Sequence, residues 1–437
     1  MEAIEINFEG LPGPTHHFGG LSYGNLACAE SKNRVSHPKA AALQCLEKMR
    51  LLADHGVKQA VLPPHPRPHL EGLKGLGFQG NDKDILKNTF NEAPGLLAAH
   101  YSASAMWTAN AATVSPSNDT ADGKVHITPA NLVTELHRSL ECDFTSKVLK
   151  QIFSDEKLFT HHAALPKTRT LADEGSANQI RLAPNHSRKG IEIFVYGTDA
   201  LDVKHGRPHR YPARQTLQAS QAIARLHATN AVFAQQNPHL IDIGVFHNDL
   251  ISLGNENLFL YHSLAFVDTL HTIGKLKAHY NKTCGEDLIA VEIPEADLSP
   301  IDAVNSYLFN SQLITTKDGW LLVAPKQCEE MPKAKACIEK LIKDEANPIK
   351  KVIFVNLDES LANGGGPACL RLPLVLTEKE LKALHPGVIF SEKLYDKLKN
   401  LVERRWRDHL ETKDLADPNF MEESQKAFCD VMEILKL

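Results

Sequence analysis

The chain has 437 residues, of which 43% are hydrophobic and 23% charged, which is the normal mixture of a folded globular protein. Its net charge of -5, its pI near 6.5 and the lack of any lysine- or arginine-rich run argue against a nucleic-acid partner. The first residues lack the basic and apolar regions of a secretory signal, and no apolar run reaches the ~18 residues of a membrane helix. We therefore expect a cytoplasmic protein.

A similar pattern of short apolar runs recurs along the chain. Near the N-terminus we predict a helix over residues 38–53, with Pro38 in its first turn, and a strand over 59–62. Hairpins are then predicted from residues 111–115 with 124–128, 249–253 with 258–262, and 311–315 with 320–324. The turn signals between these runs are Asp122-Gly123, Gly254-Asn255 and Asp318-Gly319.

Helical stretches followed by further short strands complete the pattern. The helices are predicted at 212–227, 264–280 and 332–343, and the strands after them at 232–234, 288–293 and 352–355. An asparagine recurs in similar settings at Asn110, Asn178, Asn248, Asn310 and Asn363. The unit reads as ββαβ, about five times, and such units should pack around a common axis because each alone leaves a sheet face bare. The alternative is an ordinary mixed α/β chain in which asparagine recurs by chance.

The segment from Leu361 to Leu372 contains three consecutive glycines shortly before Cys369. Glycines allow a sharp turn or a close backbone approach, and a thiolate at the start of a strand is a plausible nucleophile. A phosphate-binding loop is not expected, because no Lys-Ser/Thr pair follows and no helix begins here. A simply buried cysteine remains an alternative, since the other seven cysteines form no CxxC pair and each is expected to be a reduced thiol.

Two further segments carry groups suited to this chemistry. His247 precedes the predicted hairpin at 249–262 together with Asp249, and histidine titrates in the range a cysteine nucleophile needs. Glu174 lies beside Asp173 before another expected hairpin, and carboxylates pair well with a planar guanidinium. A structural histidine and a turn-capping acid are the corresponding alternatives.

Three apparent motifs are rejected. Gly20-Leu21-Ser22-Tyr23-Gly24 matches the GxSxG elbow, but loop residues rather than a strand precede it. The tract from His65 to His69 has no HExxH or CxxC beside it, so zinc is not expected. The glycines between residues 72 and 77 have the wrong spacing for a dinucleotide site.

Taken together, these segments resemble the N-succinylarginine dihydrolase family of the guanidino-modifying (pentein) superfamily. The resemblance covers nearly the whole chain and includes NFEGLPGPTHHFGGLSYGN, MWTANAAT, DEGSANQIRL, GVFHNDL, YLFNSQL and NGGGPACLRL. It implies one catalytic domain over residues 1–437, folded as a five-bladed α/β propeller of ββαβ units with pseudo-five-fold symmetry. It also implies a homodimer and no metal or organic cofactor.

The resemblance further implies the site and the reaction. The nucleophile falls on Cys369, the histidine on His247 and the acid on Glu174. The expected substrate-binding residues are Gly19, Gly20, Leu21, Ser22, Tyr23, Gly24, Asn25, Leu26, Ala27, Cys28, Asn110, His137, Arg138, Arg214, Asp249 and Asn363. Cys28 departs from the pattern, since a smaller hydroxyl residue is expected there.

The expected reaction converts N2-succinylarginine and water into N2-succinylornithine, carbon dioxide and two ammonia, in the arginine succinyltransferase route of arginine breakdown. Glu174 and Asp249 would hold the guanidinium, and Arg138 and Arg214 the carboxylates. His247 would be the cationic neighbour of Cys369 and would serve both the departing ammonia and the attacking water. An enzyme that stops after one hydrolysis, a non-catalytic pentein and a serine hydrolase acting through Ser22 are the competing interpretations.

Overall fold

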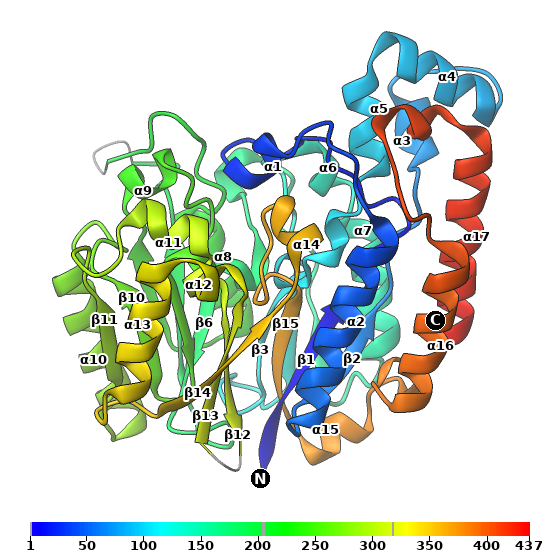
Figure 1. The fold of residues 1–437 in the computed structure, drawn as a ribbon. Coiled ribbons are helices and arrows are strands. Elements are labelled where there is room, and N and C mark those ends of the chain that lie inside the picture. The colour runs from blue at the N-terminus through cyan, green and yellow to red at the C-terminus, as the bar shows by residue number, and fades with distance from the viewer. Residues whose placement is uncertain (1, 203–205, 317–318) are drawn as a thin grey trace.

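Five three-stranded sheets form the frame of the molecule in the computed structural model, which describes residues 2–202, 206–316 and 319–437 (Figure 1). In each sheet the first pair of strands is antiparallel and the second pair is parallel, with a helix between the last two strands along the chain. This is the predicted ββαβ unit. The prediction of a five-bladed α/β propeller is confirmed.

Four blades are continuous in sequence. The first contains β3 (Ala112–Ser115), β4 (Val125–Pro129), α7 (Cys142–Ile152) and β5 (Phe159–His161). The second contains β6 (Gln179–Leu182), β7 (Ile191–Tyr196), α8 (Leu217–His227) and β8 (Ala231–Gln235). The third contains β9 (Ser252–Asn255), β10 (Leu258–His262), α10 (Thr269–Cys284) and β11 (Ile289–Ile293). The fourth contains β12 (Gln312–Thr316), β13 (Gly319–Pro325), α13 (Pro332–Lys343) and β14 (Ile349–Val355).

The fifth blade joins the two ends of the chain. Its first strand is β15 (Arg371–Thr377), and the rest comes from β1 (Ala3–Gly10), α2 (Pro38–Asp54) and β2 (Lys58–Leu62). Figure 1 shows blue β1 beside orange β15 in the middle of the molecule. Because the strand that follows Cys369, β15, is paired with the N-terminal strand β1, closure of the ring holds the Cys369 segment in place.

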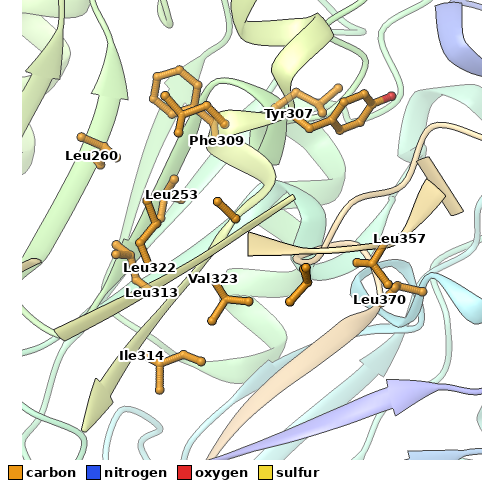
Figure 2. Packing of buried hydrophobic residues seen from close by; sticks show 14 of the residues in the cluster. Leu253, Leu260, Tyr307, Phe309, Leu313, Ile314, Leu322, Val323, Leu357 and Leu370 are labelled. Atoms are coloured by element: carbon orange, nitrogen blue, oxygen red, sulfur yellow. The ribbon is translucent and has the colours of Figure 1, made fainter. Parts of the chain in front are cut away.

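Apolar side chains fill the space between blades and around the axis. Leu253 and Leu260 of the third blade lie in one buried cluster with Leu313 and Leu322 of the fourth, as Figure 2 shows. β9 contacts both β6 and β12, and β3 contacts β15, so the first strand of each blade lies near the axis. This arrangement brings together the residues that immediately precede the first strands.

Further helices lie outside the five units. The connection from β2 to β3 contains α3 (Leu70–Gly75), α4 (Asp82–Glu92) and α5 (Pro94–Tyr101), and the chain ends with α15 (Glu378–Lys382), α16 (Glu392–Arg405) and α17 (Pro418–Leu435). The shorter helices are α1 (Leu26–Glu30), α6 (Leu136–Ser139), α9 (Pro238–Asp242), α11 (Pro300–Ser306), α12 (Gln327–Glu330) and α14 (Asp358–Ala362). In Figure 1, α1, α6 and α14 gather at the end of the sheets opposite the N-terminus.

Several predicted boundaries need correction. The helix expected at 212–227 begins only at Leu217, because the hydroxyl of Thr216 caps it. The helix expected at 264–280 begins at Thr269, where Asp268 supplies the cap. The third-blade turn lies at Glu256 and Asn257 rather than at Gly254-Asn255, since Asn255 pairs with Leu258. The run at 249–253 begins with a 3-10 turn before β9. In the predicted Asp318-Gly319 turn, Asp318 lies outside the described residues.

None of the helices built from described residues is both long and apolar enough to cross a membrane.

Candidate active site

Four of the five recurring asparagines lie just before the first strand of a blade, whereas Asn363 lies further from β15 and Cys369 occupies the corresponding place there. Asn110, Asn178, Asn248 and Asn310 lie in short 3-10 helices, and Asn363 caps the end of α14. Three of them bind the next blade around the axis. Asn110 donates to the Glu174 carbonyl at 2.6 Å, Asn178 accepts from the Asn248 backbone N–H at 2.9 Å, and Asn310 accepts from the Cys369 N–H at 3.3 Å. The repeat thus places the candidate catalytic residues around one centre.

Glu174 and His247 form a buried pair at this centre. His247 Nε2 lies 2.9 Å from Glu174 Oε2, and the side chains are 1% and 0% exposed. An ionised carboxylate only accepts hydrogen bonds, so Nε2 carries the proton and Nδ1 is the basic nitrogen. Within the described part of the chain, Nδ1 has no hydrogen-bond partner. His247 can therefore accept a proton at Nδ1 while Glu174 holds the ring.

Charges around this pair fix its protonation. Burial raises the pKa of Glu174, but the Arg138 guanidinium at 3.2 Å and the His247 hydrogen bond outweigh it and lower the pKa to about 2. Thr134 and Gln215 add hydrogen bonds to the Glu174 side chain and backbone. Burial lowers the pKa of His247, so the ring is neutral before any substrate binds. Glu174 is therefore an anion next to a neutral imidazole.

Cys369 lies against Asp249 and Asn310. Its Sγ is 3.4 Å from Asp249 Oδ2, and Asn310 Nδ2 donates to Sγ at 3.1 Å. Burial and the Asp249 carboxylate raise the pKa of the thiol well above its ordinary value, whereas the Asn310 amide favours the thiolate. Burial also raises the pKa of Asp249. The thiol is thus protonated at rest, and a cation must arrive before it ionises.

The three glycines before Cys369 are needed for close packing. A Cβ at Gly364 would lie 2.0 Å from the Asn25 side chain, and Gly364 also has a positive φ of 89°. A Cβ at Gly365 would lie 2.1 Å from the Trp107 indole, and one at Gly366 2.7 Å from Asn310 Oδ1. The close backbone approach that the glycines predict is therefore an approach of this loop to the side chains of Asn25, Trp107 and Asn310.

The predicted binding loop from Gly19 to Cys28 covers the site. Asn25 caps α1 by accepting from the Cys28 N–H, and its amide donates to the Asn363 carbonyl at 3.0 Å. Arg214 donates to the Ser22 hydroxyl at 2.9 Å and to the Tyr23 carbonyl at 2.8 Å. The loop is tied in this way to the last asparagine of the repeat and to the segment before α8.

A small pocket lies under this loop. The predicted binding residues that line it are Gly19, Leu21, Ser22, Cys28, His137 and Asn363. Of the others, Asn110, Arg138 and Asp249 lie at the catalytic centre through contacts with Glu174 or Cys369. Tyr23 is 60% exposed and packs on Tyr211 instead. Leu26 packs near Gly244 rather than toward the pocket.

Sequence reasoning missed several residues of the site. Asn310 was noted only as a member of the repeat, although its amide contacts the nucleophile's sulfur. Glu135 accepts from the Tyr23 N–H at 3.0 Å and lies 3.5 Å from Arg214, and its place two residues before His137 was the only local signal. Lys48 was read as a helix residue, yet it donates to both oxygens of Glu9 and to the Pro367 carbonyl.

Arg138 and Arg214 each keep unused donors in the buried site. In the residues that the structure describes, no hydrogen bond is made by Nε and Nη2 of Arg138 or by Nε of Arg214. Both side chains are nearly fully buried. Buried guanidinium donors are ordinarily hydrogen-bonded, and a bidentate carboxylate is the ligand that fits them best. Nowhere in residues 2–202, 206–316 or 319–437 do three His, Cys, Asp or Glu residues cluster to hold a metal.

The sequence as a whole matches known proteins. The family model described as succinylarginine dihydrolase matches residues 2–437. The chain belongs to this family. It is 49% identical over 438 residues to N-succinylarginine dihydrolase of Marinobacter nauticus, covering 100% of this chain and 97% of that protein. It is 49% identical over 441 residues to N-succinylarginine dihydrolase of Pseudomonas aeruginosa, covering 100% of this chain and 98% of that protein. The prediction of the family, and with it of a hydrolase, is confirmed.

Solved structures share the fold at low sequence identity. The apo structure of ArgZ, an arginine dihydrolase of cyanobacteria, matches with a TM-score of 0.51 and 14% identity over 89% of this chain and 42% of that chain. The ternary complex of AgrE with ornithine and NAD+ matches with a TM-score of 0.50 and 16% identity over 85% of this chain and 39% of that chain. At this identity the likeness concerns the propeller fold alone.

Proposed function

We propose that this protein hydrolyses N2-succinyl-L-arginine to N2-succinyl-L-ornithine, two ammonia and carbon dioxide, with Cys369 as nucleophile, His247 as proton carrier and Glu174 as its carboxylate partner. The observation that carries the proposal is the convergence of Cys369, Asp249 and the Glu174–His247 pair from three blades at one buried centre. The family of the chain supports the substrate. We assign the step to arginine breakdown by the arginine succinyltransferase pathway.

Substrate binding supplies the missing cation. The guanidinium binds between the carboxylates of Glu174 and Asp249, where its planar N–H groups meet paired oxygens. Its charge offsets the effect of Asp249 on Cys369 and lowers the cost of forming the thiolate. The Asn310 amide then donates to the sulfur anion, a hydrogen bond stronger than the one it makes to the thiol. Ionisation is in this way linked to the presence of substrate.

The first hydrolysis proceeds through a covalent intermediate. The thiolate forms a bond to the central guanidino carbon, and the electrons of the C=N bond move to nitrogen. His247 delivers the proton that came from the thiol to a terminal nitrogen, the C–N bond breaks and ammonia leaves. Nδ1 of His247 then takes a proton from water, whose oxygen attacks the carbon while the C–S bond breaks. The product is a neutral ureido compound, the extra proton of the guanidinium passes to solvent, and Cys369 is left as a thiolate beside the protonated His247.

The second hydrolysis acts on the ureido group, which carries no charge, so the protonated His247 left by the first round is the cation that keeps Cys369 a thiolate. The thiolate attacks the carbonyl carbon, the remaining terminal nitrogen leaves as ammonia, and water releases a carbamate that decomposes to the amine and carbon dioxide. Arg138 and Arg214 bind the succinyl and α-carboxylates through their unused donors, which selects a substrate with two anionic groups. We further propose that the working protein is a cytoplasmic homodimer without a cofactor.

The direct test is to incubate the purified protein with N-succinylarginine and, separately, with free arginine. The proposal predicts two ammonia for each succinylarginine consumed and very little from arginine. One ammonia for each substrate would instead identify an enzyme that stops at the ureido product. No ammonia from either compound would remove the proposal.

A further inference from the structure

A second cavity lies on the propeller axis, on the side of the catalytic centre away from the binding loop. It has a volume of about 110 Å3, whereas one water molecule needs roughly 10–15 Å3 measured in the same way, so several waters fit. Among its lining residues, one from each blade lies just before the first strand: Ala109, Ala177, Asn248, Phe309 and Ala368. Residues on the first strands, such as Val114 on β3 and Val375 on β15, form its wall.

The cavity reaches the nucleophile through one side chain. Asp249 lines the cavity and also accepts from Cys369 Sγ through Oδ2 at 3.4 Å. Its Oδ1 is buried and, like the Ser311 hydroxyl and the Asn248 amide nitrogen of the same lining, makes no hydrogen bond to any group the structure describes. Buried polar groups around a space large enough for water bind water. The floor of the cavity is therefore suited to small polar molecules.

The far end of the cavity is ringed by charged residues with some solvent exposure. Arg371 lies 3.3 Å from Glu5, and His186 lies 3.6 Å from Glu256 and 3.9 Å from Glu5. The side chains of Glu5, Glu256 and His186 are 11–14% exposed, whereas Ser311 at the floor is 1% exposed. The cavity thus runs from a partly exposed ionic rim to the catalytic centre.

We propose that this axial cavity is the path by which water enters and ammonia leaves while the binding loop keeps the larger reactant in place. The inference rests on the proposed function, in which the ureido compound must stay bound between two hydrolyses. Each round of hydrolysis consumes one water and produces one ammonia. Cys369, where both rounds take place, is only 2% exposed. Ammonia and water fit a passage lined by serine, asparagine and alanine, whereas a ureido compound with a succinyl chain does not.

The test narrows the cavity by substitutions in its wall and measures the ammonia released for each succinylarginine consumed. Val114→Phe and Val375→Phe each replace a valine of the cavity wall by a larger aromatic side chain. Val267→Phe is the matched control, because Val267 is 58% exposed and lies outside the cavity lining. With the axial path filled, ammonia leaves only when the binding loop opens, and the ureido compound then escapes. We expect the ratio of ammonia to succinylarginine consumed to fall from two toward one, with the ureido compound in solution.

The possible outcomes distinguish a failure of the axial path from a failure of the proposed function. A ratio that stays at two in both folded phenylalanine variants, whatever their rates, overturns the axial path. A wild-type ratio other than two overturns the proposed function instead. If melting curves show that neither phenylalanine variant folds, Ser311→Ala adds no volume and removes the unpaired hydroxyl at the floor. Release of the ureido compound by Ser311→Ala supports the path, and its absence overturns it.

Discussion

Asn310 offers the sharpest test of how the thiolate forms. Its amide donates to Cys369 Sγ at 3.1 Å, and it is the asparagine of the repeat whose side chain contacts the proposed nucleophile. A hydrogen bond to a charged group contributes about 1.5–3 kcal/mol, and one pKa unit corresponds to about 1.4 kcal/mol. Asn310→Ala should therefore raise the pKa of the thiol by roughly one to two units. Asn310→Asp should raise it further, because it adds a carboxylate beside the sulfur.

The assay is the pH dependence of alkylation of Cys369 by iodoacetamide, followed by peptide mass spectrometry. Cys429 is the exposed cysteine of the eight and is first replaced by serine so that it does not compete. Limited access to Cys369 slows alkylation at every pH but leaves the midpoint unchanged. Asn347→Ala is the control, since Asn347 is equally buried and bridges the backbone at Leu341 and Ile349, within the fourth blade. A midpoint in Asn310→Ala equal to that of Asn347→Ala would refute the assigned role.

Cys369→Ser should keep its melting temperature and lose turnover by several orders of magnitude, because a serine hydroxyl stays protonated where a thiolate forms; near-normal ammonia release would rule out the mechanism. Arg214→Ala should weaken succinylarginine binding by roughly 2–5 kcal/mol, as measured by calorimetry, since a substrate carboxylate is left unpaired, and unchanged affinity would exclude this contact. Burial raises the pKa of Glu192 from 4.5 to about 7, so its contribution to stability is present below about pH 4.5 and is lost as the pH rises through 7. Glu192→Gln, which resembles the protonated acid, should raise Tm more at about pH 8 than at about pH 5, and an equal change at both would contradict the assignment.

Local sequence signals predicted most of the blades. The helix expected at 332–343 matches α13, and the strand expected at 258–262 matches β10. The errors came from competing local signals. Pro212 is an acceptable first helical residue, but Arg214 and Gln215 lie in a bend and make contacts with Ser22, Tyr23 and the Glu174 backbone, so the helix begins only after the Thr216 cap.

The closure of the ring was outside the reach of periodicity. β15 pairs with β1, and neither segment carries a local signal for a partner at the other end of the chain. The roles of Lys48 and Glu9, which support the Pro367 carbonyl, depend on the same closure. That residues 1–437 form one catalytic domain is still a prediction.

The candidate site was predicted as a set of residues but not as a network. The chain motifs placed Glu174, His247, Asp249 and Cys369, and the structure brings them together. We predicted His247 as a cation beside Cys369, whereas in the structure burial lowers the pKa of the ring and Glu174 is its partner. Protonation depends on burial and on neighbours from other blades, which no local motif contains.

The covalent intermediate on Cys369 is the central claim, and mass spectrometry of its peptide tests it most directly. The His247→Ala variant is mixed with succinylarginine, quenched over a time course and digested. Without Nδ1 to carry protons, attack should be slow and water should not be directed at the adduct, so an added mass on Cys369 should appear slowly and persist. Wild-type protein quenched during turnover should carry the same mass transiently. Ammonia release by wild-type protein with no added mass on Cys369 at any time, or an adduct in the variant that clears at the wild-type rate, would contradict the account.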